Sequence, residues 1–371
     1  MHIVLDFRPA LRQGTGVGTY VRSLATALSE GFPEESYTVF SASWKDRLGA
    51  AQVPEGVAIV DRKIPVRLLD WTWHRWRWPA LERFVGAADV AHSPSPMLMP
   101  ARGARTVVTV HDCYFIRHPE DVFGPVRRDY VPLARGAAQA ADAVVVNSES
   151  TAAEVEELMG VSRDKICVTP LGVARHFFDP VATDREILER AGIDRPFLLF
   201  VGRRERRKDL ATLLAAFDEL CTDPGDLQLV LVGPDAPGWD ETWAEASETA
   251  RHHVRILPYQ EAARLASLYA AASVLVMPSR WEGFGLPGLE AMACGTPVVA
   301  HKVGALPAVL GDAACFAAAG DPSALAHECR LLLHDTDRVH RARQVGRRHA
   351  AGFTWAETAR RTHELYRRLN P

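Results

Sequence analysis

Two glutamates, Glu282 and Glu290, lie eight positions apart in the stretch SRWEGFGLPGLEAMACGTPVVA, residues 279–300. A carboxylate accepts paired hydrogen bonds from neighbouring hydroxyl groups, so each of them suits the diol of a ribose or a hexose. Two glutamates at this distance are expected by chance about once in a chain of this length and composition. The signal is therefore the whole pattern EGFGLPGLE, in which glycines and a proline separate the acids.

The same pattern predicts a short helix. Pro287 suits a first helical turn, Gly295 a carboxyl-terminal cap and Pro297 a stop, so PGLEAMAC is expected to be helical. Its free backbone N–H groups would bind an anion, and the preceding glycines would let a phosphate or a sugar hydroxyl approach the backbone. With Glu290 in about the first turn and Glu282 in the preceding loop, both acids can face one ligand.

A second set of charged residues follows the apolar run PFLLFV. In GRRERRKDL, Arg203 and Lys208 would supply two cations for a diphosphate, since guanidinium offers forked donors and ammonium a compact charge. The alternative is a basic helix start without a ligand. The interleaved arginines are expected to be solvated; they are Arg204, Arg206 and Arg207. No D-x-D or His/Cys cluster follows a predicted strand, so we expect neither a metal ion nor another cofactor.

The elements that would position these residues are parallel strands joined by helices. Short apolar runs alternate with longer segments of helical period, which is typical of repeated βαβ units. The predicted strands are residues 2–7, 37–40, 57–60, 89–93, 105–110 and 142–147, and then 196–202, 227–233, 253–258, 273–279 and 296–300. Two successive sets imply two doubly wound α/β domains, and the ligands of such sheets bind beyond the carboxyl ends of the strands.

The boundary between the two domains is predicted from composition. The segment PLGVARHFFDPVATDREILERAG mixes proline, glycine and polar residues, so the boundary is expected within 172–194. We therefore predict a first domain over 1–172 and a second, with its linker, over 173–352. The remaining residues, 353–371, are predicted to form a helix, because Thr354 stands in a capping-box position near their start.

Composition supports soluble globular domains. The 371 residues are 47% hydrophobic and 24% charged, enough for two cores. The formal net charge of -3 gives no reason to expect nucleic acid as a partner. The six cysteines include no C-x-x-C pair and are interpreted as reduced thiols. The first residues, MHIVLDFRPA, lack the features of a secretion signal, and no apolar run is long enough to span a bilayer, so we expect a cytoplasmic protein.

Two features of the first domain follow predicted strands. The loop GTGVGTY has the spacing G-x-G-x-G, and the threonine at position 19 breaks the G-x-G-x-x-G pattern of dinucleotide enzymes. No acidic residue ends the second strand either, so a nicotinamide enzyme is not expected. A plain tight turn is one interpretation of this loop. His111 ends the run TVVTV, and one interpretation is a structural histidine held by Asp112 or by the backbone.

These motifs together resemble the retaining glycosyltransferases of family 4, also called group 1, and bacterial mannosyltransferases among them. The resemblance covers nearly the whole chain, from the glycine-rich first loop through VVTVHD, ADAVVVNSESTAAEV, PLGV and FVGRRERRKDLATLLAAF to the closing FTWAETA helix. It implies the α/β fold called GT-B, in which two Rossmann-like doubly wound domains face a central crevice. It also implies that 1–172 binds the acceptor, that 173–352 binds a nucleotide sugar, and that the helix 353–371 returns to the first domain.

The resemblance assigns roles to single residues. Glu282 would contact the donor sugar and Glu290 the ribose hydroxyls. The loop between them would meet the sugar and the phosphates through its backbone, at Gly283, Phe284, Gly285 and Leu286. Arg203 and Lys208 would grip the donor diphosphate.

In the first domain, the resemblance places Gly16 close to the donor and His111 near the donor sugar. The expected catalytic residues are then His111, Glu282, Lys208 and Arg203. In retaining transfer of this kind the phosphate leaves and the acceptor attacks on the same face, with a leaving phosphate oxygen taking the proton. The protein would mainly supply position and charge stabilisation.

The donor and the acceptor are also implied by resemblance alone. HSPSPMLMP and VHDCYFIRHPE look most like mannosyltransferases of surface-polysaccharide assembly, so GDP-mannose is the first expected donor and a UDP-hexose the second. The acceptor would be a saccharide or a lipid-linked saccharide. A nucleotide-sugar-binding partner protein without activity and a GT-B sugar-nucleotide epimerase remain the alternatives.

The segment WTWHRWRWPALERF concentrates tryptophan and arginine. Its tryptophans are Trp71, Trp73, Trp76 and Trp78. Aromatic and basic residues together suit a membrane interface, which would give peripheral contact at the inner face of the membrane and fit a lipid-linked acceptor. The favoured interpretation is instead a helix whose tryptophans pack inside the domain before Pro79.

Overall fold

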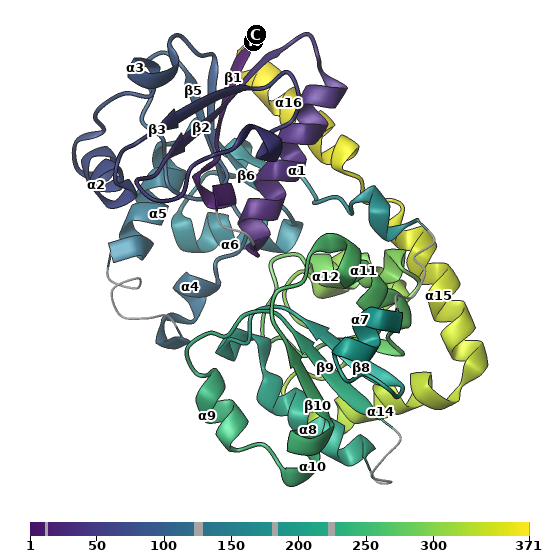
Figure 1. The fold of residues 1–371 in the computed structure, drawn as a ribbon. Helices are drawn as coiled ribbons and strands as arrows, with labels where there is room; N and C mark the ends of the chain where they lie inside the picture. Colours follow the sequence, from purple (N-terminus) through teal and green to yellow (C-terminus); the bar gives the residue numbers. More distant parts are fainter. Residues whose placement is uncertain (12–13, 122–128, 180–184, 222–226, 371) are drawn as a thin grey trace. The chain divides into compact units, whose positions relative to one another are not determined.

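The computed structural model describes residues 1–11, 14–121, 129–179, 185–221 and 227–370. The chain divides into two units, Met1–Gly172 with Thr354–Pro371 and Val173–Phe353. Each unit is a parallel sheet with helices packed against it (Figure 1). The structure therefore contains two doubly wound α/β units, and the fold class predicted from the sequence is confirmed.

The sheet of the first unit has the strand order β3-β2-β1-β4-β5-β6-β7, and every pairing is parallel. Its strands are β1 His2–Asp6, β2 Ser36–Ala42, β3 Ala58–Arg62, β4 Val90–Ser93, β5 Arg105–Val110, β6 Ala143–Val146 and β7 Ile166–Val168. The order reverses at β1, so the crevice between the loops after β1 and β4 is the place where such a sheet binds ligands.

Helices cover both faces of this sheet. They are η1 Arg8–Leu11, α1 Gly16–Gly31, η2 Ala50–Gln52, α2 Val66–Trp76, α3 Glu82–Val85, α4 Tyr114–Arg117, η3 Pro119–Asp121, α5 Val131–Ala140, α6 Glu149–Met159, η5 Arg163–Lys165 and α16 Trp355–Leu369. Helix α16, drawn in yellow, packs alongside α1 (Figure 1). Thr354 caps it by accepting a hydrogen bond from Glu357 N, and Tyr366 is buried against His92 of β4. The last helix of the chain therefore completes the core of the first unit.

The second unit repeats the same plan. Its strand order is β10-β9-β8-β11-β12-β13, and all pairings are parallel. The strands are β8 Phe197–Val201, β9 Gln228–Val232, β10 Val254–Leu257, β11 Val274–Met277, β12 Val298–His301 and β13 Cys315–Ala317. The helices are η6 Arg175–Phe177, α7 Arg185–Arg190, η7 Arg206–Lys208, α8 Leu210–Leu220, α9 Trp239–Ala244, α10 Glu248–His253, α11 Ala262–Ala271, α12 Leu286–Ala293, α13 Leu306–Leu310, η8 Gly311–Ala313, α14 Pro322–His334 and α15 Thr336–Ala350.

All the strands predicted from apolar runs are present. Central parallel strands are buried on both faces, so they are continuous apolar runs that stand out in the sequence. The structure adds β7 and β13, two short strands at sheet edges that the sequence did not predict. Within the described residues, no helix is long and apolar enough to cross a membrane.

Candidate functional site

Glu282 is the centre of a buried ion-pair cluster in the loop after β11. Its Oε1 accepts hydrogen bonds from Lys208 Nζ and from Ser279 Oγ, the latter at 2.6 Å. Its Oε2 accepts a bond from Arg207 Nη1 at 3.2 Å. Burial alone raises the pKa of this carboxyl, but Lys208 and Arg207 outweigh burial and lower the pKa to about 2. Glu282 is therefore ionised at any physiological pH.

Lys208 ends the short helix η7, beyond the carboxyl end of β8, and is buried. Burial lowers its pKa, while the carboxylate of Glu282 acts in the opposite direction. An ammonium has three N–H donors, so the bond to Glu282 leaves donors for a further anion. Arg203 is exposed two residues after the end of β8. The structure thus places both predicted cations at the carboxyl edge of the sheet in the second unit.

The expectation that the interleaved arginines are all solvated is wrong. Arg204 is buried, and its Nε donates to Asp235 Oδ1 at 2.8 Å while its Nη1 bonds Gly233 O. Arg207 is partly buried and contacts Glu282 as described above. Arg204 therefore ties the loop after β8 to the loop after β9, and Arg207 helps to hold the acid of the cluster.

Glu290 lies in a different environment from Glu282. It is the fifth residue of α12, at the start of the second helical turn and close to the predicted position in about the first turn. Its Oε2 accepts a hydrogen bond from the buried Tyr269 OH at 2.9 Å. Burial raises the pKa of Glu290 to about 7, although the bond from Tyr269 acts to lower it. Of the two predicted acids, one is therefore fixed in its charged form and the other titrates near neutral pH.

The residues from Gly283 to Gly285 form a loop that leads into α12, whose first residue is Leu286. Gly285 has a φ of +105°, and a Cβ there would lie 2.4 Å from Leu306 Cδ2. A Cβ on Gly288 would lie 2.9 Å from Leu310 Cδ2, and the ring of Phe284 is buried. A side chain at either position would thus press on a leucine of α13, so both glycines suit the packing of α12 against α13 whether or not a ligand approaches them.

Gly16 differs from those glycines. It is the first residue of α1, after the N-cap Thr15, whose hydroxyl accepts a bond from Gly18 N at 3.1 Å. Gly16 is exposed, and a Cβ on it would meet no atom within 4 Å. Packing inside the first unit therefore does not require a glycine at this position, and its role toward a ligand stays a prediction.

His111 follows β5 and is held by the backbone. Its Nε2 lies 3.0 Å from Pro94 O, and its ring meets that of Tyr20 edge to face at 4.9 Å between centroids. Burial lowers the pKa of His111, despite opposing effects of the Pro94 carbonyl and Asp112. Because a carbonyl only accepts, Nε2 carries the proton and Nδ1 is the acceptor of a neutral ring. The backbone contact of the structural interpretation is thus present, and the role at the donor sugar stays a prediction.

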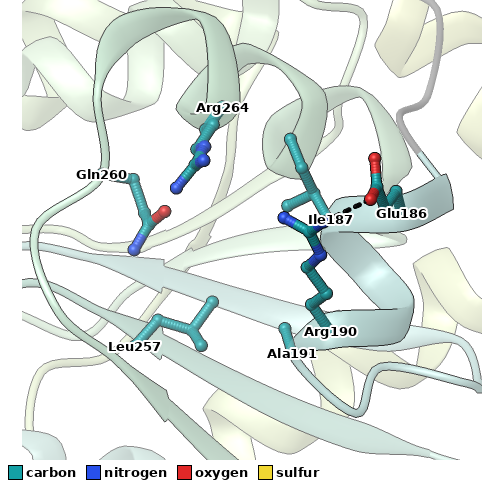
Figure 2. A pocket seen from close by; sticks show the side chains of 7 residues that line it. All are labelled: Glu186, Ile187, Arg190, Ala191, Leu257, Gln260 and Arg264. Carbon is teal, nitrogen blue, oxygen red and sulfur yellow. Dashed lines mark hydrogen bonds and ion pairs between the residues drawn. The ribbon is translucent and has the colours of Figure 1, made fainter.

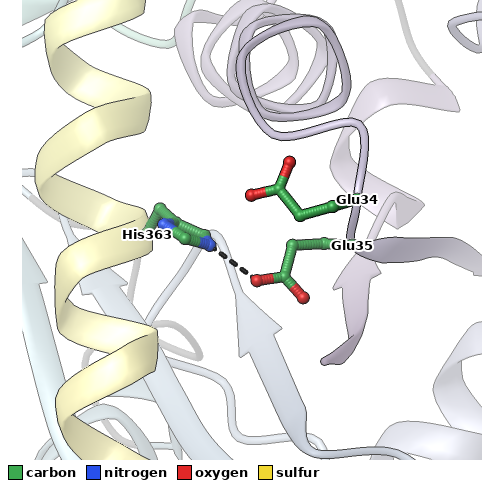
Figure 3. Close-up of side chains that lie close together, drawn as sticks. All are labelled: Glu34, Glu35 and His363. Carbon is green, nitrogen blue, oxygen red and sulfur yellow. Dashed lines mark hydrogen bonds and ion pairs between the residues drawn. The ribbon is translucent and has the colours of Figure 1, made fainter.

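One group of side chains in the first unit has metal-ligand composition. Glu34, Glu35 and His363 bring their ligand atoms within 4.8 Å of one another (Figure 3). His363 Nε2 is 2.9 Å from Glu35 Oε1, and the other oxygen of Glu35 pairs with the ammonium of Met1. Glu35 precedes β2, so the group lies at the amino edge of the sheet, opposite the edge that carries His111. We interpret it as a polar network that fastens α16.

A pocket of about 220 Å³ lies on the second unit, between α7 and the end of β10. Figure 2 shows its lining side chains, with an ion pair between Arg190 and Glu186 on α7. The lining residues are Glu186, Ile187, Arg190, Ala191, Leu257, Gln260 and Arg264. Since Leu257 ends β10, the pocket opens near the carboxyl edge of the sheet, but no predicted site residue lines it.

Sequence reasoning missed three residues of the candidate site. Ser279 and Arg207 bond Glu282, and Tyr269 bonds Glu290. Ser279 stands only three residues before its partner, so its spacing was a usable signal. Tyr269 comes from α11 and is brought to Glu290 by helix packing, which no local pattern encodes.

Known proteins resemble the chain in sequence. Residues 184–349 match the family described as glycosyl transferases group 1, and residues 14–176 match glycosyltransferase family 4. D-inositol 3-phosphate glycosyltransferase 1 of Catenulispora acidiphila is 34% identical over 310 residues, covering 77% of this chain and 73% of that protein. O-antigen chain mannosyltransferase B of Escherichia coli is 29% identical over 287 residues, covering 76% of this chain and 74% of that protein. The D-inositol 3-phosphate glycosyltransferase of Corynebacterium urealyticum is 35% identical over 244 residues, which are 62% of this chain but 57% of that relative.

Solved structures show the same fold. Sucrose-phosphate synthase from Thermosynechococcus elongatus superposes with a TM-score of 0.77 at 23% identity, over 99% of this chain and 98% of that one. Anabaena HepE in complex with UDP and glucose gives a TM-score of 0.73 at 17% identity, and the superposition covers 99% of this chain and 100% of that one. Together with the sequence matches, these similarities show that the chain belongs to the group 1 glycosyltransferases of family 4 and has the GT-B fold.

Proposed function

We propose that this protein transfers a hexose from a nucleotide diphosphate sugar to a hydroxyl of a saccharide, with retention at the anomeric carbon. The observation that carries the proposal is the buried cluster of Glu282 and Lys208 beside the helix α12. Burying two opposite charges costs several kcal/mol per ion, which offsets much of their attraction. Such a pair therefore adds little to the stability of the fold, and a purely structural role explains it poorly. At the carboxyl edge of a parallel sheet it suits a ligand with hydroxyls and phosphates.

The proposed step breaks the bond between the anomeric carbon and the diphosphate oxygen and forms a bond from that carbon to the acceptor oxygen. The acceptor proton passes to the leaving phosphate. Arg203 and Lys208 hold the diphosphate and stabilise its growing negative charge. Glu282 accepts hydrogen bonds from the sugar hydroxyls, and the backbone from Gly283 to Leu286 meets sugar and phosphate.

The remaining predicted residues complete this proposal. Glu290 binds the ribose diol of the donor. Gly16 and His111, from the first unit, approach the donor sugar, with Nδ1 of the neutral His111 ring as an acceptor for a sugar hydroxyl. No metal ion is part of the proposed step, since the cations of the chain take its place.

The donor and acceptor are proposed from the relatives. Escherichia coli O-antigen chain mannosyltransferase B supports mannose, with GDP-mannose as first donor, whereas Anabaena HepE in complex with UDP and glucose supports a UDP-hexose as second. The acceptor is proposed to be a saccharide, free or lipid-linked. The name of the Catenulispora relative adds D-inositol 3-phosphate as an acceptor to be tried. The rival proposal is a nucleotide-sugar-binding protein without activity.

The test begins with a thermal-shift screen of GDP, UDP and their hexoses. A ligand at about 100 times its dissociation constant stabilises a protein by about 2.7 kcal/mol, so one nucleotide should stand out. The selected donor is then incubated with acceptors, with and without EDTA, and the anomer of the product is determined by NMR. We expect transfer with retention that survives EDTA. Binding without transfer to any acceptor would favour the rival, and conversion of the donor without acceptor would indicate an epimerase.

Glu290→Gln is expected to stabilise the protein and weaken its binding of the nucleotide. The native carboxyl keeps its proton up to a pKa of about 7 instead of 4.5, so the free energy of unfolding of the wild type falls as pH rises through this window. At pH 8 the variant should gain up to about 3 kcal/mol, because one pKa unit corresponds to about 1.4 kcal/mol. It should lose about 1 to 3 kcal/mol of nucleotide affinity if the charged carboxylate accepts bonds from the diol.

Urea unfolding and calorimetry at pH 5.5 and pH 8 separate the two effects. The wild type should bind the nucleotide more weakly at the lower pH, where Glu290 is protonated, and the variant should show no such difference. A wild-type affinity that is equal at both values would remove Glu290 from the ribose. An unchanged stability would mean that the carboxyl titrates normally.

A further inference from the structure

The helix α2 and the residues directly after it carry large aromatic side chains on the outside of the first unit. Trp71, Trp76 and Trp78 are 53%, 56% and 52% exposed, and Leu68 is 53% exposed. Only Trp73 is buried, at 2%. The interpretation of this segment as a packed helix is therefore right for one tryptophan and wrong for the other three. Contact between water and the large apolar surface of an indole ring is unfavourable, so a cluster of exposed indoles points to a binding partner.

The inner face of α2 already accounts for its packing. Leu69 and Trp73 belong to a hydrophobic cluster that includes Phe40 of β2. Trp73 Nε1 donates to Pro79 O at 2.9 Å, and the guanidinium of Arg8 stacks 4.7 Å from the Trp73 ring. The outer side chains are thus not needed to hold α2 on the sheet.

The outer face is also basic. Arg67, Arg75 and Arg77 are exposed, and none of them pairs with an acid in the described part of the chain. The acid of this helix, Asp70, is instead engaged by Arg8 Nη1 at 2.6 Å. We call this set the α2 surface; it comprises Arg67, Leu68, Trp71, Arg75, Trp76, Arg77 and Trp78. It combines indoles with unneutralised guanidinium groups.

We propose that the α2 surface docks the protein on an anionic phospholipid bilayer. Indole rings favour the headgroup level of a membrane, where one end of the ring is apolar and the other is wet. Arginines beside them attract the negative surface of anionic lipids and bond phosphates with forked donors. No described helix could span a bilayer, so the contact is peripheral.

A second copy of the chain fits this surface less well. A two-fold contact places the same patch on both partners, so the three arginines would face their own copies with no acid between them. A bilayer containing acidic lipids supplies the complementary charge instead. The inference goes beyond glycosyl transfer, and vesicle binding can be measured without any donor or acceptor.

The test is flotation of the purified chain with vesicles of phosphatidylcholine, with and without phosphatidylglycerol. The wild type should float with the anionic vesicles and be released by high salt. Trp71→Ser/Trp76→Ser should lower the partition coefficient about tenfold or more, since each indole loses a large apolar contact area. Arg67→Glu/Arg75→Glu should lower it about fivefold or more per arginine, the value typical of one basic residue at an anionic surface.

Arg341→Glu/Arg343→Glu on α15 is the control, because it makes the same charge change at exposed positions of the second unit. It should leave vesicle binding unchanged, and all variants should keep the wild-type circular dichroism and nucleotide affinity. Absence of wild-type binding, equal binding by the tryptophan variant, or equal loss in the control would each overturn the proposal. So would a dimer in sedimentation velocity that the tryptophan variant dissociates while vesicle binding persists.

Discussion

Lys208→Ala is expected to lower kcat by about 100- to 1,000-fold and to change donor affinity much less. In the proposed reaction negative charge grows on the diphosphate as the glycosidic bond breaks. A cation that interacts more strongly with the transition state than with the bound donor shows its effect in kcat. Lys208 is buried at the carboxyl edge of the sheet, where water screens such an interaction little.

The structure also predicts a loss of stability in this variant. Without Lys208, Glu282 stays buried with Arg207 and Ser279 as its remaining partners, and an undercompensated buried charge is costly. Lys208→Ala/Glu282→Gln removes both charges, so it should recover free energy of unfolding without recovering kcat. Because Glu282 also belongs to the proposed site, this double variant tests only the effect of the unpaired charge on stability.

Arg206→Ala is the matched control, because Arg206 is an exposed cation in the same short helix. It should keep a wild-type kcat, and Lys208→Arg should regain only part of the activity, since a planar fork does not reproduce a compact ammonium. Steady-state kinetics at saturating acceptor and urea unfolding are the measurements. A folded Lys208→Ala protein with normal kcat and a raised KM would mean that the lysine only helps the donor to bind.

The order of the main elements could be predicted because buried parallel strands are continuous apolar runs. Strands such as β8 and β9 are fully apolar or nearly so, and they end in loops rich in glycine and charge. The edge strands β7 and β13 are only three residues long and partly buried, so their sequences, ICV and CFA, are too short to stand out as apolar runs. Their strand conformation depends on the neighbouring strand rather than on their own pattern.

The identity of the candidate site residues was encoded locally, but their contacts were not. The run of basic residues after β8 offers no local difference between Arg204 and Arg206. Asp235, from the loop after β9, makes the difference by pairing with Arg204. In the same way, the elevated pKa of Glu290 follows from burial under packed helices, which spacing within one helix does not reveal.

Gly304→Ala is expected to destabilise the second unit by several kcal/mol and to displace Glu282. Gly304 has a φ of +51°, a conformation that costs other residues about 1 to 2 kcal/mol. In addition, a Cβ at this position would lie 2.4 Å from Glu282 O and 3.1 Å from Glu282 N. That backbone is held in place by Ala305 N, which donates to Glu282 O at 2.9 Å. Backbone has no rotamer by which to move aside, so the loop itself must shift.

Gly320→Ala isolates the conformational part of this effect. Gly320 has a φ of +71°, and a Cβ on it would meet no atom within 4 Å, so its variant should lose only the conformational cost of about 1 to 2 kcal/mol. The excess loss in Gly304→Ala then measures the collision with Glu282. Because the loop of Glu282 carries the proposed sugar contact, Gly304→Ala should also lower kcat/KM in material that is still folded at low temperature, whereas Gly320→Ala should not. Equal losses of stability and full activity in both variants would mean that the loop yields freely, and that the position of Glu282 is not fixed by Gly304.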